Sequence, residues 1–279
     1  MQRRGFLALA GAMLTAPALL RAAEPIRLGL TPVFLDNDAE VILRLREALG
    51  AGTGRPIDLV QKRTYQEVTG LLLEGGVDAA WLCGFPFLQH EQALALIGVP
   101  VWRGGPRYRS YLIVGAADEA TGLADLEGGT HAFSDPDSNS GWLVTASDLA
   151  RIGRKPEEFF QRSLFTYGHR NVVRAVAGGL TRSGSVDGYV WEALVQVDPE
   201  LTARTKVLSR SEELGFPPFV ARSGMTEQPA VASLRSALLE MADGAPGKAA
   251  LDLLQLDGIT TGDVSLYDGI RLRMQDLAG

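Results

Sequence analysis

The chain has 279 residues, of which 27 are Lys or Arg and 33 are Asp or Glu, giving a formal net charge of −6. This acidic balance argues against nucleic acid or an anionic membrane as a partner, although local N–H groups can still hold a small anion. The length fits one large or two medium domains. Cys83 is the only cysteine, which excludes an internal disulfide, and three scattered histidines give no zinc-ligand spacing. We therefore expect neither a metal nor a cofactor.

The first 23 residues have the order of an export signal. Arg3 and Arg4 precede a short apolar run that contains Pro17, and the small residues Ala22 and Ala23 follow it. The paired arginines followed by Phe-Leu resemble the twin-arginine export signal of bacteria. An uncleaved anchor helix is the alternative, but the run is short for a membrane span. We expect cleavage near residue 23, which leaves 24 basic and 33 acidic residues in a periplasmic protein.

Strand and helix signals alternate along the first half of the remaining chain. Strands are predicted at 26–30, 56–60, 77–82, 99–102 and 108–114, and helices at 39–49, at 65–73 and, after a loop at 83–86, up to about 96. The helix at 39–49 follows from an apolar stripe at helical spacing, and Gly75-Gly76 is typical of a helix end. This βαβ alternation predicts a parallel sheet with helices on both faces.

The alternation then starts again after residue 114. The second half predicts a short helix at 123–126, a strand at 130–134, helices at 141–152 and 157–161, a strand at 164–167, a helix at 171–177 and a strand at 186–190. Three helices at 229–243, 247–254 and 267–277 close the chain. The restart predicts a second α/β unit, with crossover strands near 111–115 and 206–210 joining the two.

The segment from Ser134 to Gly141 reads Ser-Asp-Pro-Asp-Ser-Asn-Ser-Gly and joins a predicted strand to a predicted helix. Asp-Pro-Asp is turn chemistry, and Ser138, Asn139 and Ser140 are all good N-cap residues. A helix start offers unpaired N–H groups, and these together with the hydroxyls suit an anion. On these residues alone, anion binding and plain helix capping are equally open.

Several local motifs share one resemblance. They are the strand Gly76–Trp81 with its following loop Gly84–Phe87, the serine loop Asp135–Gly141, the helix start Gly168–His169 and the Val-Asp pair of Val186–Gly188. Together they resemble type II periplasmic binding proteins, in particular the phosphate-, phosphite- and phosphonate-binding components of ABC importers. The likeness extends over essentially the whole chain after residue 23, and the serine loop is its most specific part.

The resemblance implies an α/β fold with two lobes, each a mostly parallel sheet flanked by helices, and a ligand cleft between them. Lobe 1 is then expected at 24–112 plus 213–279 and lobe 2 at 113–212. The implied function is to bind a small oxyanion such as phosphonate, phosphite or phosphate and deliver it, as a monomer, to an ABC permease in the inner membrane. A sulfonate or other organic anion is the alternative ligand, and a ligand-sensing module for a membrane receptor is the alternative role.

Ten residues are predicted to line the cleft: Ser138, Asn139, Ser140, Gly141, His169, Phe34, Tyr65, Phe85, Trp191 and Glu192. The two serine hydroxyls and the N–H groups of residues 139–141 would bind the oxyanion, and Gly141 would let the backbone come close. His169 either donates to the anion or caps its helix. The aromatic residues either wall the cleft or pack in the core.

Other positions carry weaker expectations. Trp191 and Glu192 are placed at the end of the strand at 186–190, facing the cleft, where Glu192 either accepts from the ligand or is a surface acid. Asp187 is expected to orient backbone and not to bind ligand. The segment 178–185 looks longer than the family's usual link, and Cys83 falls where some phosphonate binders have a tyrosine. Because no catalytic signature is present, we expect no enzyme activity.

Overall fold

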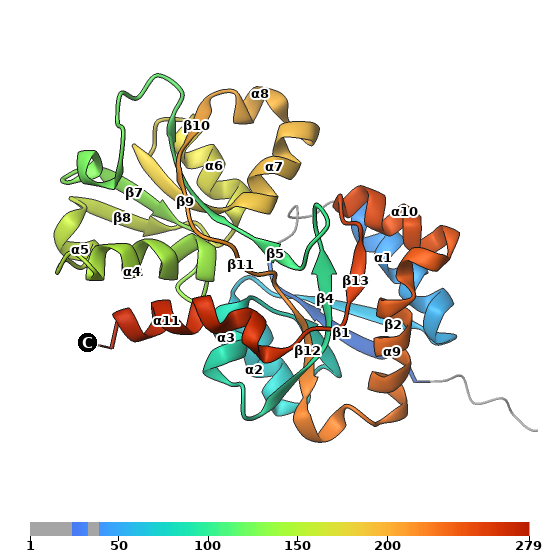
Figure 1. Cartoon of the computed structure of the whole chain (residues 1–279). Helices are drawn as coiled ribbons and strands as arrows, with labels where there is room; N and C mark the ends of the chain where they lie inside the picture. The colour runs from blue at the N-terminus through green and yellow to red at the C-terminus, as the bar shows by residue number, and fades with distance from the viewer. Residues whose placement is uncertain (1–23, 33–38, 279) are drawn as a thin grey trace, which may run out of the picture.

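The computed structural model describes residues 24–32 and 39–278, so the predicted signal segment and Phe34 lie outside the described residues. The described chain forms two α/β units side by side, each a sheet flanked by helices (Figure 1). The predicted two-lobed α/β architecture is confirmed. The lobe bounds stay a prediction; β6 (Ser110–Gly115), which spans the predicted boundary at residue 112, pairs along its length with strands of the second sheet.

The first sheet has six strands in the order β13-β4-β12-β3-β1-β2. Its strands are β1 (Ile26–Leu30), β2 (Ile57–Gln61), β3 (Ala79–Trp81), β4 (Leu94–Val101), β12 (Phe219–Arg222) and β13 (Gly258–Thr260). β1 runs parallel to β2 and β3, whereas β12 and β13 pair antiparallel with their neighbours. The helices of this unit are α1 (Ala39–Thr53), α2 (Tyr65–Glu74), α3 (Gly84–Gln89), α9 (Pro229–Leu239) and α10 (Ala245–Leu254), with 3₁₀ turns at Ser223–Met225, Met241–Asp243 and Val264–Tyr267. The last helix, α11 (Asp268–Asp276), packs against α3 of this unit and α4 of the other.

The second sheet has five strands in the order β10-β6-β9-β7-β8. They are β6, β7 (Thr130–Phe133), β8 (Arg162–Phe165), β9 (Ser183–Asp187) and β10 (Thr205–Arg210). Its helices are α4 (Val144–Ala150), α5 (Pro156–Phe159), α6 (His169–Ala177), α7 (Gly188–Val197) and α8 (Pro199–Thr202), with a 3₁₀ turn at Leu123–Leu126 and a π-helical turn, η2, at Asn139–Leu143. Both sheets are mixed: β12 and β13 in the first sheet and β6 in the second run against the other strands of their sheet.

Two chain passages connect the units. One runs from β4 through β5 (Arg107–Tyr108) into β6, and the other runs from β10 through β11 (Leu214–Gly215) into β12. β5 and β11 pair antiparallel, so the two passages lie side by side. The crossover strands predicted near 111–115 and 206–210 correspond to β6 and β10, which pair with each other inside the second sheet at the end of these passages, so the hinge stays a prediction.

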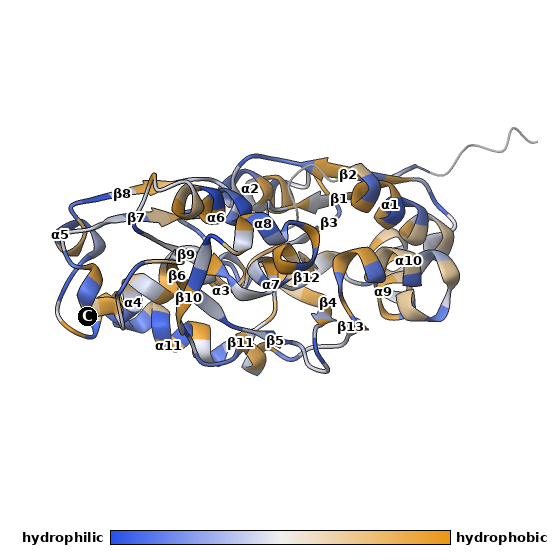
Figure 2. Cartoon of the chain, turned by 90° about the horizontal axis from the view of Figure 1, so that it is seen from above, coloured by the Kyte–Doolittle hydropathy of each residue, from blue (hydrophilic) through white to orange (hydrophobic). Residues whose placement is uncertain are grey.

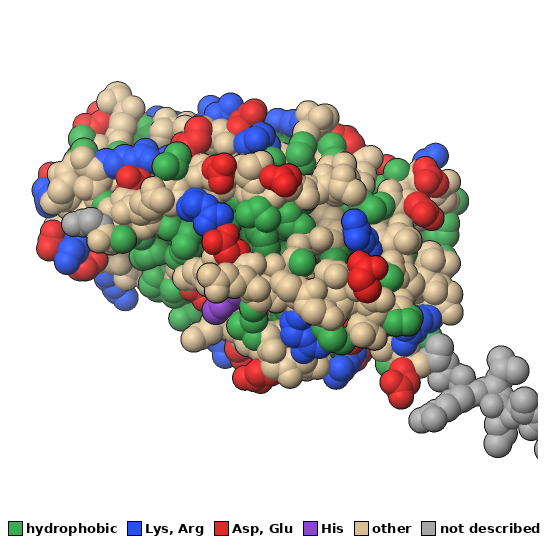
Figure 3. Space-filling view, turned by 60° about the horizontal axis from the view of Figure 1, so that its bottom comes forward, with side chains coloured by type: hydrophobic (Ala, Val, Ile, Leu, Met, Phe, Trp, Pro, Cys, Tyr) green, Lys and Arg blue, Asp and Glu red, His purple; other side chains and the backbone are tan. Residues whose placement is uncertain are grey.

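Apolar side chains fill both units. One core runs from the first sheet into the inner part of the second, and a smaller cluster that includes Leu126, Phe133, Leu149 and Phe159 lies under the outer helices of the second. Orange segments accordingly recur along the strands and helices of both units in Figure 2. On the face that Figure 3 shows, acidic and basic side chains are interspersed among apolar ones.

Local signals explain several elements. Thr64 caps α2 in a capping box with Glu67, and Gly75 ends the helix in the left-handed conformation at φ 81°, as its sequence predicts. The predicted helix through residue 96 is wrong: α3 already begins at Gly84 and ends at Gln89, and Leu94–Val101 is a strand. This strand lies between β12 and β13 inside the sheet, which accounts for its continuous apolar run. Sequence periodicity alone does not distinguish such a buried strand from a buried helix.

The strand predicted at 186–190 is also wrong in position. β9 covers Ser183–Asp187, and the helix α7 begins at Gly188, where the side chain of Asp187 accepts a hydrogen bond from Val190 N at 3.3 Å. Small residues are needed in β9 because a Cβ on Gly184 would lie 2.5 Å from Val172 Cγ1 of α6. The link after α6 is therefore short, and the apparent extra length of 178–185 is part of the strand.

Candidate functional site

The predicted serine loop is buried between the two units. Ser138, Asn139 and Ser140 are 0%, 0% and 1% exposed. The chain enters helix α4 through the π-helical turn η2, a type of turn that is common at functional sites. Ser138 Oγ accepts a hydrogen bond from Gly141 N at 2.9 Å, so the predicted capping role is present.

Gly141 is required by a close approach. A Cβ built on this residue would overlap Ser134 Oγ and lie 2.7 Å from Ser134 Cβ. The same two residues are tied by a backbone hydrogen bond from Ser134 N to Gly141 O, 3.1 Å long. The loop therefore folds back on the end of β7 and presents its polar atoms together.

Three side-chain oxygens of this loop have no hydrogen-bond partner. They are Ser134 Oγ, Asn139 Oδ1 and Ser140 Oγ, and they make up half of the six such buried atoms among the residues that the structure describes. Leaving a buried polar group unpaired costs about 1–3 kcal/mol. Their concentration in one loop between two units is what a polar ligand site requires, because the ligand supplies the partners.

Tyr65 and His169 meet across the two units. Tyr65 is the first residue of α2, and its Oη lies 3.2 Å from His169 Nε2 at the start of α6. His169 Nδ1 accepts from Asp187 N at 3.0 Å, so in the neutral ring the proton is on Nε2 and is donated to Tyr65 Oη. The hydroxyl hydrogen of Tyr65 then remains available to a ligand. Burial lowers the pKa of His169 to about 3, so the ring brings no charge.

Asp135 and Asp187 supply the carboxyl groups of the site. Asp135 Oδ2 accepts from Tyr65 N at 3.2 Å, a second link between the units. Asp187 is 1% exposed, and burial raises its pKa to about 7, so the group exchanges its proton near neutral pH. It orients backbone as predicted, yet it also lies close enough to Tyr65 and Cys83 to raise the pKa of both. Sequence reasoning missed this second role, since it placed Asp187 at the start of a strand and not at its end.

Asn139 is held by the first unit. Its backbone N donates to Cys83 Sγ at 3.3 Å, and its side-chain Nδ2 donates to Tyr108 Oη at 2.8 Å. The N–H group that was expected to point at the anion is therefore engaged by the thiol. Burial raises the pKa of Cys83 to about 12, which keeps this sulfur protonated and a poor nucleophile.

The remaining predicted residues are placed differently. Phe85 belongs to α3, is buried and stacks on Trp142 with ring centroids 6.1 Å apart. Trp191 and Glu192 do not end a strand but lie in α7: Trp191 Nε1 donates to Thr205 Oγ1 at 3.1 Å. Both residues fall in a helix because β9 ends at Asp187 and α7 begins at Gly188, where a strand was predicted.

Glu192 forms a contact between the units. It accepts from Tyr111 Oη at 2.9 Å and from the Arg103 guanidinium at 3.1 Å. Arg103 lies after β4, in the first unit, and adopts a positive φ of 50° that is uncommon for a non-glycine residue. The strained backbone of Arg103 thus coincides with the contact that its side chain makes to Glu192 of the other unit, and such strain is typical of functional contacts.

Comparison with known proteins gives one consistent result. A sequence model of the family described as ABC transporter, phosphonate, periplasmic substrate-binding protein matches residues 28–267. The phosphate-import protein PhnD of Mycolicibacterium smegmatis is 25% identical over 216 residues, which are 72% of this chain and 67% of that protein.

Solved structures agree on the fold. A binding-protein component of an ABC phosphonate transporter from Pseudomonas aeruginosa superposes with a TM-score of 0.83 at 21% identity, covering 90% of this chain and 87% of that one. PhnD1 from Prochlorococcus marinus in complex with methylphosphonate has a TM-score of 0.78 at 16% identity, covering 91% and 98%. Since the family pattern spans most of the sequence and the fold agrees, the chain belongs to the family of periplasmic substrate-binding proteins of phosphonate ABC transporters.

Proposed function

We propose that the protein binds a small phosphorus oxyanion, such as phosphonate, phosphite or phosphate, at the serine loop and delivers it to an ABC permease. The observation that carries the proposal is the set of three unpartnered oxygens of Ser134, Asn139 and Ser140 beside the Tyr65–His169 pair. Two relatives, a phosphate-import protein and a protein in complex with methylphosphonate, support the same ligand class.

The charge of the site favours phosphorus over sulfur. The hydrogen bonds of Tyr65, His169 and the Asn139 side chain use hydroxyl, amide and imidazole groups, and the nearby carboxyl of Asp187 has a pKa raised to about 7 by burial. A carboxylate repels a fully ionised anion but accepts a hydrogen bond from a P–OH group. Sulfonates carry no such proton at neutral pH, so Asp187 would discriminate against them.

Closure of the two lobes would bury the ligand. Tyr65–His169 and Asp135–Tyr65 both join the first unit to the second, and the loop they enclose is almost without solvent exposure. A site that takes donors from both sides binds its ligand best in the closed form, so the ligand shifts the population of lobes toward closure. Within this proposal, the lobes are residues 24–112 plus 213–279 and residues 113–212. No chemical step is assigned to the cleft, and a monomer suffices.

Export completes the proposal. We infer that residues 1–23 are a twin-arginine signal that is removed in the periplasm. Among the described residues 24–32 and 39–278, no helix is long and apolar enough to cross a membrane. Replacing Arg3 and Arg4 by Lys should leave unprocessed precursor inside the cell, and normal processing of that variant would exclude the twin-arginine route.

A ligand screen tests the function directly. Residues 24–279 would be titrated calorimetrically with phosphate, phosphite and methylphosphonate, and with sulfate and methanesulfonate as isosteric controls. At 100 times its Kd, a ligand that binds only the folded state raises the unfolding free energy by about 2.7 kcal/mol, which a thermal scan detects. Binding of a sulfonate with no response to the phosphorus oxyanions would move the protein to the alternative ligand class.

A further inference from the structure

The last helix, α11, joins the two units on the side of the chain passages. In Figure 2 it lies with β5 and β11 along one edge of the molecule, whereas α2, α6 and β8 lie along the opposite edge. It packs against β11 in one passage, against α3 of the first unit and α4 of the second, and it also contacts η2, the turn of the serine loop. A single helix therefore touches both units, a passage between them and the loop that we propose binds the ligand.

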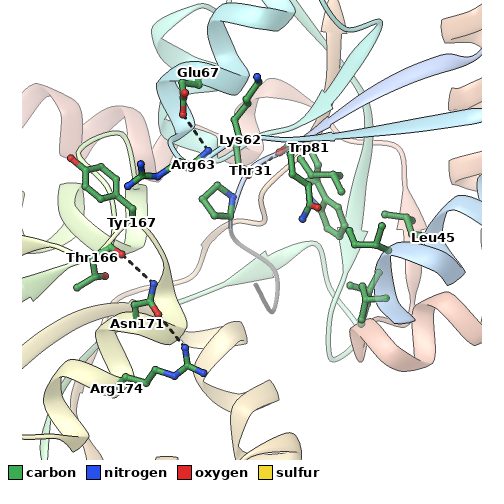
Figure 4. Close-up of a pocket in the computed structure, with 16 residues that line it drawn as sticks. Thr31, Leu45, Lys62, Arg63, Glu67, Trp81, Thr166, Tyr167, Asn171 and Arg174 are labelled. Atoms are coloured by element: carbon green, nitrogen blue, oxygen red, sulfur yellow. Dashed lines mark hydrogen bonds between the residues drawn. The ribbon is translucent and has the colours of Figure 1, made fainter. Parts of the chain in front are cut away.

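The opposite edge is held differently. A cavity of about 780 Å³ lies there between the two units, bordered by α2, α6 and the segment after β8 (Figure 4). The hydrogen bonds drawn around it stay within one unit: Thr31 Oγ1 donates to Trp81 O in the first unit, and Asn171 Nδ2 donates to Thr166 O in the second. Side chains of α11, in contrast, are bonded from one unit to the other.

The first half of α11 is fixed to the first unit. Tyr267, directly before the helix, and Ile270 within it are fully buried. The hydroxyl of Tyr267 donates to Phe216 O at 2.9 Å. Arg271 forms a bidentate pair with Glu91, which lies between α3 and β4, at 2.9 and 2.6 Å. These contacts give the helix a firm base on the first unit.

The second half of α11 reaches the second unit. Asp276 accepts a hydrogen bond from Ser147 Oγ of α4 at 2.6 Å. Arg273 Nη1 donates to Asp148 Oδ1, also in α4, at 2.7 Å and to Val144 O at 3.1 Å. Val144 is the residue at which η2 ends and α4 begins, so Arg273 holds the helix directly behind the serine loop.

Arg273 also holds a passage between the units. Its Nε and Nη2 donate to the two carboxylate oxygens of Glu212 at 2.8 and 2.6 Å, and Glu212 lies between β10 and β11. The arginine side chain is 3% exposed, whereas those of Asp148 and Glu212 are 40% and 48% exposed. Burial alone would lower the pKa of Arg273, but hydrogen bonds to the two carboxylates raise its pKa above the ordinary value, so its charge is retained. The planar fork of a guanidinium suits two carboxylates at once.

We propose that Arg273 is a positioning residue, which holds α4 and the serine loop closed against the first unit. Opening at the passages would move α4 relative to α11 and would stretch the bond from Arg273 to Asp148. Because a buried arginine that loses a carboxylate is costly, this clamp favours the closed population. Its effect on ligand binding rests on the proposed function, whereas its effect on the lobes is measurable without ligand.

Distances between two spin labels, measured by pulsed electron paramagnetic resonance, report closure directly. Leu43→Cys on α1 and Leu180→Cys after α6 provide one exposed site on each unit, and the native Cys83 is buried and stays unlabelled. In ligand-free protein, Asp148→Asn should raise the ratio of open to closed molecules roughly threefold, since it removes one partly exposed partner. Arg273→Gln removes the whole clamp and should raise this ratio roughly tenfold.

Ligand release gives a second readout. A buried oxyanion leaves only after the lobes open, so its dissociation rate should rise by the same two factors. Stopped-flow displacement would measure this rate for phosphate, phosphite and methylphosphonate. In both variants, saturation with a bound oxyanion should restore the label distance of the closed wild-type protein.

Further variants separate positioning from general support of the fold. Arg273→Lys keeps the charge but lacks the donor fork, so it should restore only part of the closed population. Adding Asp148→Asn to Arg273→Gln should open the lobes no further, because both substitutions act on one clamp. Glu127→Gln is the matched control: it breaks a 2.8 Å ion pair to Arg154 inside the second unit and should leave the label distances as in wild type. Circular dichroism checks folding, and if Arg273→Gln fails to fold, Asp148→Asn carries the test.

The outcomes separate the two proposals. Unchanged label distances in the folded clamp variants, even with a lower unfolding free energy, would assign Arg273 to packing of α11 and overturn the inference. Equal opening in Glu127→Gln would overturn it too. Failure to bind phosphate, phosphite and methylphosphonate would instead remove the proposed function, and the ligand-free distances would still decide whether Arg273 holds the lobes.

Discussion

The two hydroxyls of the serine loop should respond oppositely to removal. Ser138 Oγ accepts from Gly141 N, whereas Ser140 Oγ is buried without a well-formed hydrogen bond. Burial raises the pKa of Tyr108, and the nearby Ser140 side chain offsets part of that rise, so the two hydroxyls are neighbours. Ser138→Ala removes an N-cap and should lower the unfolding free energy of the ligand-free protein by about 1 kcal/mol. Ser140→Ala removes a hydroxyl whose burial costs about 1–3 kcal/mol when the lobes are closed, so stability should stay unchanged or rise.

Removing the Ser140 hydroxyl should weaken ligand binding although it does not lower stability. A hydrogen bond to a charged group contributes roughly 1.5–3 kcal/mol, and a tenfold change in Kd corresponds to about 1.4 kcal/mol. Ser140→Ala should therefore weaken binding of the identified oxyanion about 10- to 100-fold while the ligand-free protein remains at least as stable. A stabilising substitution that removes function is the signature of a group kept for the ligand.

The assay pairs urea denaturation of ligand-free protein with calorimetric titration. Thr181→Val is the matched control, because Thr181 Oγ1 is also buried without a partner but belongs to the link after α6 and not to the serine loop. It should share the stability effect and leave Kd unchanged. If Ser140→Ala destabilised the protein by more than about 1 kcal/mol and bound ligand normally, the hydroxyl would be structural and our reasoning on the loop would be refuted.

Three other outcomes are expected. Gly141→Ala should destabilise the protein and abolish oxyanion binding because its Cβ would overlap a serine hydroxyl, whereas Gly70→Ala, with open space around an α2 position, should raise the unfolding free energy by about 0.5–1 kcal/mol in the same urea titration. Burial raises the pKa of Asp187 to about 7, so between about pH 4 and 7 the folded protein holds a proton that the unfolded chain releases. The unfolding free energy therefore decreases as the pH rises through this window, and the loss is complete once the pH exceeds the folded pKa. Asp187→Asn should accordingly make the slope of unfolding free energy against pH more positive by about 1.4 kcal/mol per unit in that window, and parallel slopes would contradict the assignment. Glu192→Gln removes the ion pair to Arg103 between the units and should weaken oxyanion affinity by up to about fivefold. Adding Arg103→Gln should weaken the affinity no further, and full additivity of the two substitutions would show that the ion pair is not the cause.

Local sequence patterns predicted most elements because their causes are local. The capping box and Gly75 fix the ends of α2 within one stretch of a dozen residues. The Asp-Pro-Asp turn and the following cap residues likewise place the serine loop between β7 and α4. Where a residue's conformation depends on neighbours in the sequence, the sequence is sufficient.

The errors occur where distant packing overrides local propensity. Ser183, Gly184 and Ser185 have little strand character, yet they form β9 because only small side chains fit between α6 and the strands on either side. The β-branched and aromatic residues after them favour a strand and instead form α7, which Asp187 caps. That shift placed Trp191 and Glu192 on a helix and not at a strand end, and it put Asp187 at the end of β9.

The sequence by itself determined the α/β alternation and predicted an export signal and a candidate anion loop at Asp135–Gly141, since turn, cap and periodicity signals are encoded in adjacent residues. Only the tertiary structure decided which atoms of that loop are satisfied and which are free. The partners of Asn139 lie 31 and 56 residues away, and Tyr65 meets His169 across 104 residues. Hydrogen-bond satisfaction in a buried site is set by groups that only folding brings together, so the unpartnered oxygens that we propose to bind the ligand are identified by the fold and not by the motif.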